Sequence, residues 1–445
     1  MTAGASTAIL AHGLGGSSDL PIPFTYALIG AAWALTFTFA VVALAWRTPR
    51  FDPGKPGRAL PEWVTTAVDA PATRWVVATI ALVFTGWVAM AAFFGPDGAD
   101  NPLAGVFYVL IWVGVPALSL FVGPLWRAVS PVRSAYRVAT LGRARDGRPY
   151  SERLGYWPAA AGLFAFVWLE LASADPGSLH AIRTWLLIYL AVIAAGTLWW
   201  GLRWPARADP FEVYSVVASR LSPLRRDRES GRIAIGNPFD HLLTLPVRGG
   251  TLAVLAVLLG STAFDSFSAT PAFRTFVDEH TSSAAAATLV RTAGLLVFVG
   301  VVAGTFWLAA RATGGVDTAL RRKLPGLMAH SLIPIVIGYI FAHYLTYLIE
   351  RGQQTVIRLA DPLGRGWNLF GLADAEVSYV LSMHPAVLAT LKVGFVVAGH
   401  IAGVIAAHDR ALRLLPRDHQ LTGQLAMMLV MVGYTFMGLY LLFGG

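Results

Sequence analysis

Long apolar segments alternate with short polar ones over the whole chain. A helix needs about 20 mostly apolar residues to cross the hydrocarbon core of a bilayer. Ten segments meet or approach that length, and the sixth differs from the rest because it ends in the polar run 261–266. The predicted membrane-spanning helices are 24–46, 75–94, 103–125, 156–174, 182–201, 249–268, 289–311, 327–349, 386–407 and 424–443. The pattern predicts an all-α polytopic transmembrane bundle in which residues 1–445 form one integral membrane domain.

The charges of the connections orient these helices. Arg and Lys gather in every second connection, as in 126–153, whereas 95–102 and 175–181 carry Asp and neither Arg nor Lys. Basic connections remain in the cytoplasm. A missed or invented helix would break the alternation downstream of itself, and only the mixed connection 350–385 departs from it. We therefore predict ten spans, both termini outside, and a location in the cell membrane.

Composition supports the same environment. Of the 445 residues, 56% are hydrophobic and 13% charged, whereas soluble domains carry about 25% charged residues. The lipid bilayer is thus the expected partner. The net charge of +9 lies in the predicted cytoplasmic connections, which favours contact with anionic lipid and argues against nucleic acid as a partner. The lack of cysteine excludes disulfides and thiolate metal sites.

Two connections are long enough to form structures of their own. Within the cytoplasmic connection 203–248, Asp209 and Pro210 are typical of a helix start. Phe211, Tyr214 and Val217 follow at helical spacing, which predicts an amphipathic helix on the inner leaflet, with a regulatory docking site as the alternative. The long outer loop 350–385 is rich in turn-forming residues and is typical of a lid or a binding element.

Ionisable residues inside membrane spans are costly and are the strongest functional indicators in such a chain. Near the outer ends of their helices lie Asp265, Glu170 and His343, with His384 and Lys392 at the start of the ninth span. The eighth span also carries a polar stripe at three- and four-residue spacing, made of Tyr339, His343, Thr346, Tyr347 and Glu350. We expect this stripe to face the bundle interior and the outer residues to share one wet pocket.

Such a pocket admits three interpretations. In the first, Asp265, His343, His384 and His12 would bind a divalent transition metal as cofactor, with Asp265, His343 and Glu170 as the catalytic residues. Alternatively, a small solute, an ion or a proton would pass along a transport path formed by Lys392, Tyr339, Tyr347 and Glu350. The third interpretation assigns each residue an ordinary interhelical hydrogen bond. We favour the second interpretation, transport of a small solute or ion, in which a small-molecule substrate is a partner of the protein.

A second polar position lies nearer the inner face. Gly399 and Gly403 flank His400 and let a neighbouring helix or a flat cofactor approach closely. His400 is thus a candidate ligand of haem or copper, in a redox-complex subunit. His408 lies about 12 Å farther along the helix and cannot bind the same iron. The alternative is that His400 bonds a backbone carbonyl across the glycine face.

Several strings resemble those of a known group of proteins. They are 12–23, 259–268, 338–345 and 361–368, together with the pair Gly399-His400. They are similar to strings in a group of actinobacterial and other bacterial polytopic membrane proteins whose members are labelled fenitrothion hydrolase. The resemblance appears along the full length. It implies hydrolysis of an organophosphorus triester, a reaction that ordinarily uses a metal-activated water, and it assigns no catalytic residues.

Overall fold

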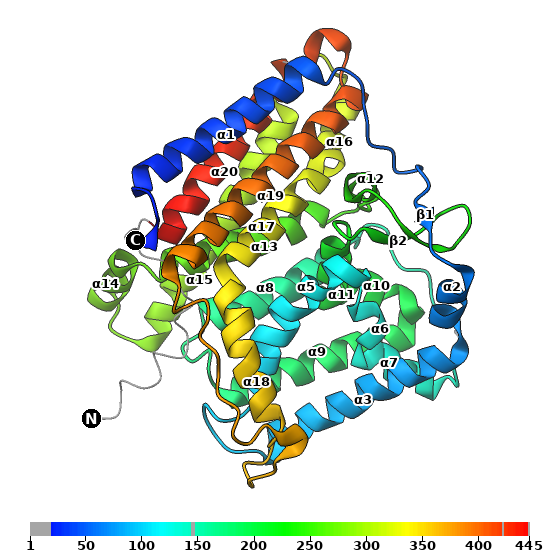
Figure 1. Ribbon diagram of the computed structural model, residues 1–445, viewed down its shortest axis with the longest axis vertical. Helices are drawn as coiled ribbons and strands as arrows, with labels where there is room; N and C mark the ends of the chain where they lie inside the picture. Colours follow the sequence, from blue (N-terminus) through cyan, green and yellow to red (C-terminus); the bar gives the residue numbers. More distant parts are fainter. Residues whose placement is uncertain (1–18, 144–146, 421, 444–445) are drawn as a thin grey trace.

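A computed structural model describes residues 19–143, 147–420 and 422–443. Helices account for nearly all of the regular structure in this part of the chain (Figure 1). The long elements are α1 (Phe24–Ala45), α3 (Pro71–Phe94), the continuous rod of α4 (Leu103–Gly105), the π-helix η3 (Val106–Gly114) and α5 (Val115–Val122), α9 (Leu179–Trp200), α13 (Thr251–Ser268), α15 (Ala284–Arg311), α19 (Pro385–Leu414) and α20 (Leu425–Phe443). A second rod joins α16 (Thr318–Met328), η5 (Ala329–Ser331), α17 (Leu332–Thr346), the π-helix η6 (Tyr347–Arg351) and α18 (Gly352–Leu359).

The all-α prediction is confirmed, and nine of the ten predicted spans correspond to helices long and apolar enough to cross a membrane within the described residues. The sixth is among them, because α13 continues through its polar end to Ser268. The fourth window differs. It folds as α8 (Trp157–Leu171), whose 15 residues extend about 22 Å, less than the hydrocarbon thickness of about 30 Å.

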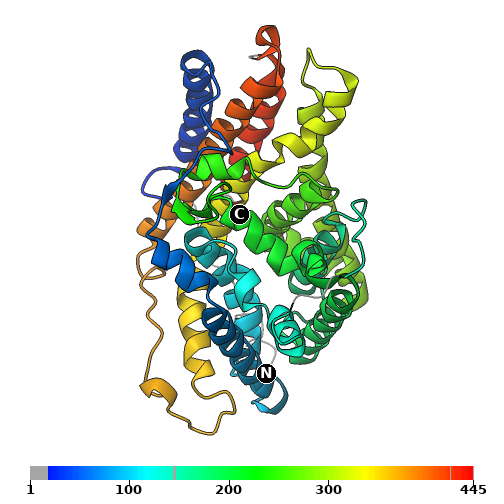
Figure 2. The ribbon, with the colours of Figure 1, turned by 90° about the vertical axis from the view of Figure 1, so that its right-hand side faces the viewer.

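The helices form two packed groups. In one, α1, α13, α15, α17, α19 and α20 run side by side (Figure 1). The other surrounds the short helix α11 (Pro210–Ser219) with η3, α5, α6 (Trp126–Val129), α8 and α10 (Pro205–Ala208); α3, α7 (Pro131–Ala139) and α9 lie outside these. The groups meet where α8 packs on α13 and η3 packs on η6. Figure 2 shows the segment between α18 and α19 as an extended strap at one end of the molecule.

Glycines allow α17 and α19 to touch through their backbones. A Cβ atom added at Gly399 would lie 2.6 Å from the Pro334 carbonyl oxygen and 3.2 Å from the Gly338 Cα. Added at Gly338, it would lie 2.5 Å from the Phe395 carbonyl oxygen. Close backbone contact of this kind is how small residues join transmembrane helices. The neighbour packed against the glycine face of α19 is therefore the helix α17.

We expect Gly399→Ala to lower the stability of the protein by about 1–3 kcal/mol, because the helices must separate to admit the methyl group. Gly394→Ala is the matched control on the same helix, where an added Cβ meets no atom within 4 Å. Thermal unfolding in detergent compares the two variants. Equal transition temperatures would contradict the close packing.

The connection predicted to be cytoplasmic is more folded than expected. After the turn η4 (Gly201–Arg203) and α10, the chain forms α11, the hairpin of β2 (Leu224–Arg226) and β3 (Ile233–Ile235), and α12 (Pro238–Leu242). β3 also pairs antiparallel with β1 (Arg58–Ala59), which precedes α2 (Glu62–Asp69). The predicted helix exists, with the Asp209 carboxylate capping the amides of Phe211 and Glu212. Its predicted place on the inner leaflet is wrong, since all ten residues are buried.

The remaining connections are short or irregular. The connection between α13 and α15 contains the helix α14 (Pro271–His280). The loop between α18 and α19 contains one short 3-10 turn, η7 (Leu369–Gly371). Two further turns, η8 (Arg417–His419) and η9 (Thr422–Gln424), precede α20. The predicted long outer loop begins later than expected, because the rod of α17, η6 and α18 continues to Leu359.

Candidate functional site

Asp265 and His343 are in direct contact between α13 and α17, where sequence reasoning placed a shared pocket. The Nε2 atom of His343 lies 2.9 Å from Oδ2 of Asp265. The Tyr344 hydroxyl donates to the same Oδ2 atom at 2.8 Å. The side chains of Asp265 and His343 are only 6% and 1% exposed. This pair, which can carry opposite charges, is therefore enclosed by protein instead of facing lipid.

The other ring nitrogen of His343 extends this contact into a chain. Its Nδ1 atom lies 3.0 Å from Oγ of Ser266, which in turn lies 3.1 Å from the Tyr339 hydroxyl. Five buried side chains are thus linked in the order Tyr339, Ser266, His343, Asp265 and Tyr344. All five belong to α13 and α17. The adjacent α13 residues Asp265 and Ser266 contact the two ring nitrogens of His343 on α17. Sequence reasoning missed Ser266 and Tyr344.

The chain can hold His343 with either one or two ring protons. In the neutral ring, Nε2–H donates to Asp265 and Nδ1 accepts from the Ser266 hydroxyl. In the imidazolium ion, Nδ1–H donates to Ser266 instead. The Ser266 hydroxyl then turns toward the Thr262 carbonyl oxygen, 3.3 Å away. Both states keep their hydrogen bonds after one hydroxyl rotation, so the site is suited to gaining and losing a proton.

Glu170, on α8, is buried beside this chain. Its charge acts on the hydroxyls of Tyr108, Tyr344 and Tyr347, and the Tyr344 and Tyr347 rings are 6.2 Å apart. When ionised, Glu170 therefore contributes negative potential at this end of the buried chain.

Two π-helical segments border the same region. η3 carries Tyr108, η6 begins at Tyr347, and the two segments pack against each other. π-Helices are rare and are frequent at functional sites, because the widened turn re-aims side chains and frees backbone carbonyls. Their position beside the buried chain strengthens the assignment of this end of the bundle as a site.

Other predicted path residues lie elsewhere. Glu350 accepts hydrogen bonds from the Ser382 amide at 2.9 Å and hydroxyl at 2.8 Å, which ties the loop before α19 to η6. Lys392 is fully buried on α19, and the charge of Asp19 acts on it. Neither residue has a described contact with the Asp265–His343 pair. The predicted stripe thus divides into Tyr339 and His343, which belong to the buried chain, and Glu350, which holds the loop.

The predicted metal set is not assembled among the described residues, which contain no group of three or more His, Asp or Glu side chains that could hold a metal ion. Both nitrogens of His343 already face protein partners. His384 is exposed, and its Nδ1 atom lies 2.8 Å from the Val380 carbonyl oxygen. His12, the fourth predicted ligand, lies outside the described residues.

His400 has a local partner. Its Nδ1 atom lies 2.8 Å from the carbonyl oxygen of Val396, one turn earlier in α19. The expected bond to a carbonyl is present, although it is made within the helix instead of across it. Because α17 fills the glycine face, that face has no space for a flat cofactor. Further along, His408 bridges Gln424 and the Trp46 carbonyl oxygen, so it anchors the end of α1.

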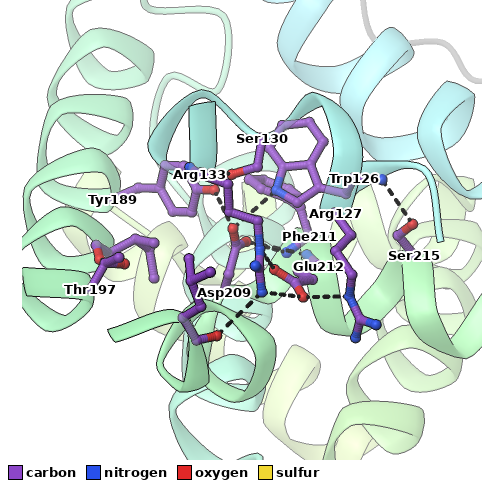
Figure 3. Close-up of polar contacts among 12 residues, drawn as sticks. Trp126, Arg127, Ser130, Arg133, Tyr189, Thr197, Asp209, Phe211, Glu212 and Ser215 are labelled. Carbon is purple, nitrogen blue, oxygen red and sulfur yellow. Dashed lines mark hydrogen bonds and ion pairs between the residues drawn. The ribbon is translucent and has the colours of Figure 1, made fainter. Parts of the chain in front are cut away.

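A second buried network, at the start of α11, was not foreseen (Figure 3). Oδ2 of Asp209 accepts hydrogen bonds from Trp126 Nε1–H and from the Tyr189 hydroxyl, both at 3.0 Å. Phe211 packs on Tyr189, in the middle of α9, with ring centroids 5.3 Å apart. α11 therefore starts well inside the helix bundle. Trp126 lies at the end of a span, where an interface anchor is the usual expectation, yet it is 6% exposed.

The next carboxylate of this network is paired with two arginines. Glu212, whose side chain has no exposed surface, accepts from Arg133 Nε at 2.6 Å and from a terminal nitrogen of Arg133 at 2.8 Å. Arg127 Nε donates to it at 2.9 Å. This bidentate pairing fixes α11 to α6 and α7. Two acidic residues three positions apart at the start of a helix, Asp209 and Glu212, were the sequence signal that could have indicated it.

Neither the protein-family models, nor the curated proteins, nor the solved structures with which the chain was compared contain a match to it.

Proposed function

We propose that this protein is a proton-linked transporter of a small solute or ion, and that the Asp265–His343 pair is its proton-binding site. The observation that carries the proposal is the chain of five buried side chains joined by hydrogen bonds between α13 and α17. Buried carboxylate and imidazole groups inside a membrane bundle are typical of proton relays. Binding and release of a proton there can bias the packing of two helices, which is what coupling requires.

The proposal includes ten membrane crossings with both termini outside, in the cell membrane. Alternation of basic and non-basic connections supports an even number of spans. The start of α1 also lies near the end of α20, since the rings of Phe24 and Tyr440 have centroids 6.4 Å apart. This proximity supports two termini on the same side of the membrane. In this proposal the 15 residues of α8 are the fourth crossing. A helix too short to span lipid alone is tolerated where protein surrounds its end and satisfies the backbone groups there.

The test does not require the substrate to be known. Proteoliposomes adsorbed on a solid-supported membrane are exposed to a rapid pH step around the usual histidine pKa, about 6.5. Proton binding at a buried site produces a transient current whose integrated charge saturates with pH. Wild-type protein should give this saturable displacement, and liposomes without protein should not. A wild-type trace identical to that of empty liposomes would refute the proposal.

One contact favours hydrolysis as a second candidate function. Because Ser266 Oγ lies 3.0 Å from His343 Nδ1 and the other imidazole nitrogen faces Asp265, the three side chains form a nucleophile, base and carboxylate series. In this candidate, Ser266 Oγ bonds to the phosphorus of a triester, its proton passes to His343, and the phosphorus–aryloxide bond breaks as the leaving aryloxide takes that proton. Water then bonds to the phosphorus and gives a proton to His343. The Ser266–phosphorus bond breaks, Ser266 Oγ recovers the proton, and the diester is released. The resemblance to the group labelled fenitrothion hydrolase agrees with such a substrate.

The two functions separate with a fluorophosphonate probe. Hydrolysis by Ser266 predicts that the probe labels the wild type and that Ser266→Ala abolishes labelling. Ser268→Ala is the control, since Ser268 bonds only the Asp265 backbone carbonyl in the described structure. Proton-linked transport predicts no labelling of any of the three proteins, because Ser266 is fully buried. Labelling is read by gel fluorescence and located by mass spectrometry.

A further inference from the structure

A basic pocket lies at the predicted cytoplasmic end and shares no residue with the Asp265–His343 site. The loop after α1, the β2–β3 hairpin and α12 surround it. It contains about 460 Å³ of empty space, part of it open to solvent. The basic and polar side chains that line it and could face an anion are Lys55, Arg220, Arg225, Arg228, His241 and Thr244.

Arg220 is the innermost cation of this pocket. It caps the C-terminal end of α11, where a positive charge is favoured by the helix dipole. Its guanidinium donates to the Thr244 hydroxyl at 2.5 Å and contacts His241 Nε2 at 3.1 Å. Burial lowers the pKa of Arg220 to about 10, so it remains charged at neutral pH. No carboxylate of the described residues forms an ion pair with it.

His241 adds no competing charge. Burial, followed by repulsion from Arg220, Arg225 and Arg228, lowers the pKa of His241 to about 4. The neutral ring at pH 7 therefore accepts a hydrogen bond from Arg220 and holds the guanidinium in place. The same repulsion indicates that these three arginines direct their charges toward one region.

Acidic side chains at the rim are already occupied or exposed. Asp227 accepts hydrogen bonds from the Ser230 amide and hydroxyl and from the Glu229 amide, which closes the hairpin turn. Arg226 is paired with Asp69, and Glu229 is exposed. Among the described contacts, Arg225 donates to the carbonyl oxygens of Lys55 and Asn237. Among the described residues, neither Lys55 nor Arg228 has an ion pair.

We propose that this pocket binds a phosphate-bearing anion, supplied either by the headgroup of an anionic inner-leaflet lipid or by a soluble phosphate compound. Arginine guanidinium groups match phosphate oxygens in geometry and charge. An anion there would supply the counter-charge that Arg220 lacks and would join the hairpin to the loop after α1. Because α11 runs from this pocket to the Asp209 network, the ligand would also stabilise that helix.

The experiment uses the full protein in nanodiscs, with pyrophosphate as the soluble probe and phosphatidylglycerol as the lipid probe. Isothermal titration in phosphatidylcholine nanodiscs measures pyrophosphate binding. Native mass spectrometry of protein released from mixed nanodiscs counts retained phosphatidylglycerol. The test variant is Lys55→Gln with Arg228→Gln, because both side chains are exposed and folding does not depend on them. The control, Arg322→Gln with Lys323→Gln, removes the same two charges from exposed positions of α16.

We expect saturable binding of one of the two probes to the wild type and the control, weakened at least about tenfold in the test variant. Pyrophosphate binding identifies a soluble phosphate, and retained phosphatidylglycerol identifies a lipid headgroup. Arg220→Gln should abolish binding. The proposal is overturned if neither probe binds, or if the control variant loses as much affinity as the test variant.

Discussion

In the Asp265→Asn variant, we expect the pH-induced charge displacement to disappear. The asparagine amide preserves the size of the side chain but carries no charge, so an imidazolium at His343 would be buried without its counter-ion. Removing one partner of a buried pair costs about 3–5 kcal/mol, which corresponds to a loss of proton affinity of about 10²- to 10³-fold or more. Protonation of His343 would then lie outside the accessible pH range.

Matched variants separate this effect from misfolding. Asp278→Asn removes the same charge from an exposed position of α14, near the same end of the bundle, and should leave the displacement unchanged. His343→Gln should abolish it, because glutamine binds no proton. Each variant is first compared with the wild type by size-exclusion profile and thermal transition. An unchanged displacement in a folded Asp265→Asn protein would place the proton site elsewhere.

In the Glu212→Gln variant, we expect the free energy of unfolding to fall by about 3–5 kcal/mol, because the substitution leaves buried cationic groups without a counter-charge. The loss falls mainly on Arg133, whose side chain is 15% exposed and makes both short contacts. Arg127 is 49% exposed and remains hydrated. Denaturant unfolding in detergent, followed by tryptophan fluorescence, measures the change.

Glu152→Gln is the control for this second effect. Glu152 also bridges two arginines, Arg207 at 2.8 Å and Arg248 at 3.0 Å, but its side chain is 71% exposed. Solvent screens such pairs, so the expected loss is at most about 1 kcal/mol. Glu212→Asp should recover part of the stability by restoring the charge. Equal losses for Glu212→Gln and Glu152→Gln would mean that the network does not hold α11 in place.

The two networks share a physical form and differ in consequence. At Glu212 the acid faces two permanently charged guanidinium groups, so the ion pair stays formed and serves structure. At Asp265 the partner is an imidazole, the side chain whose charge changes near neutral pH. This difference in partner, more than burial, is why we assign proton exchange to the Asp265–His343 pair and anchoring to the α11 network.

The sequence by itself determined the all-α membrane architecture and the approximate position of each long helix, because a 20-residue apolar run has few other stable environments. Aligned polar spacing also indicated that His343 and Tyr339 share one face of α17, and the Asp-Pro pair correctly started α11. These features depend on residues within one or two helical turns. The spacing of apolar and polar residues along the sequence therefore predicts them without knowledge of the tertiary structure.

Only the tertiary structure decided which polar residues meet. Asp265 and His343 are 78 positions apart, and their contact depends on how α13 and α17 are rotated about their axes, which spacing within each helix does not specify. The burial of α11 likewise depends on the surrounding helices: an apolar stripe at helical spacing fits a lipid surface and a protein core equally well. The choice between them is made by long-range packing, here by the aromatic and charged partners that enclose α11.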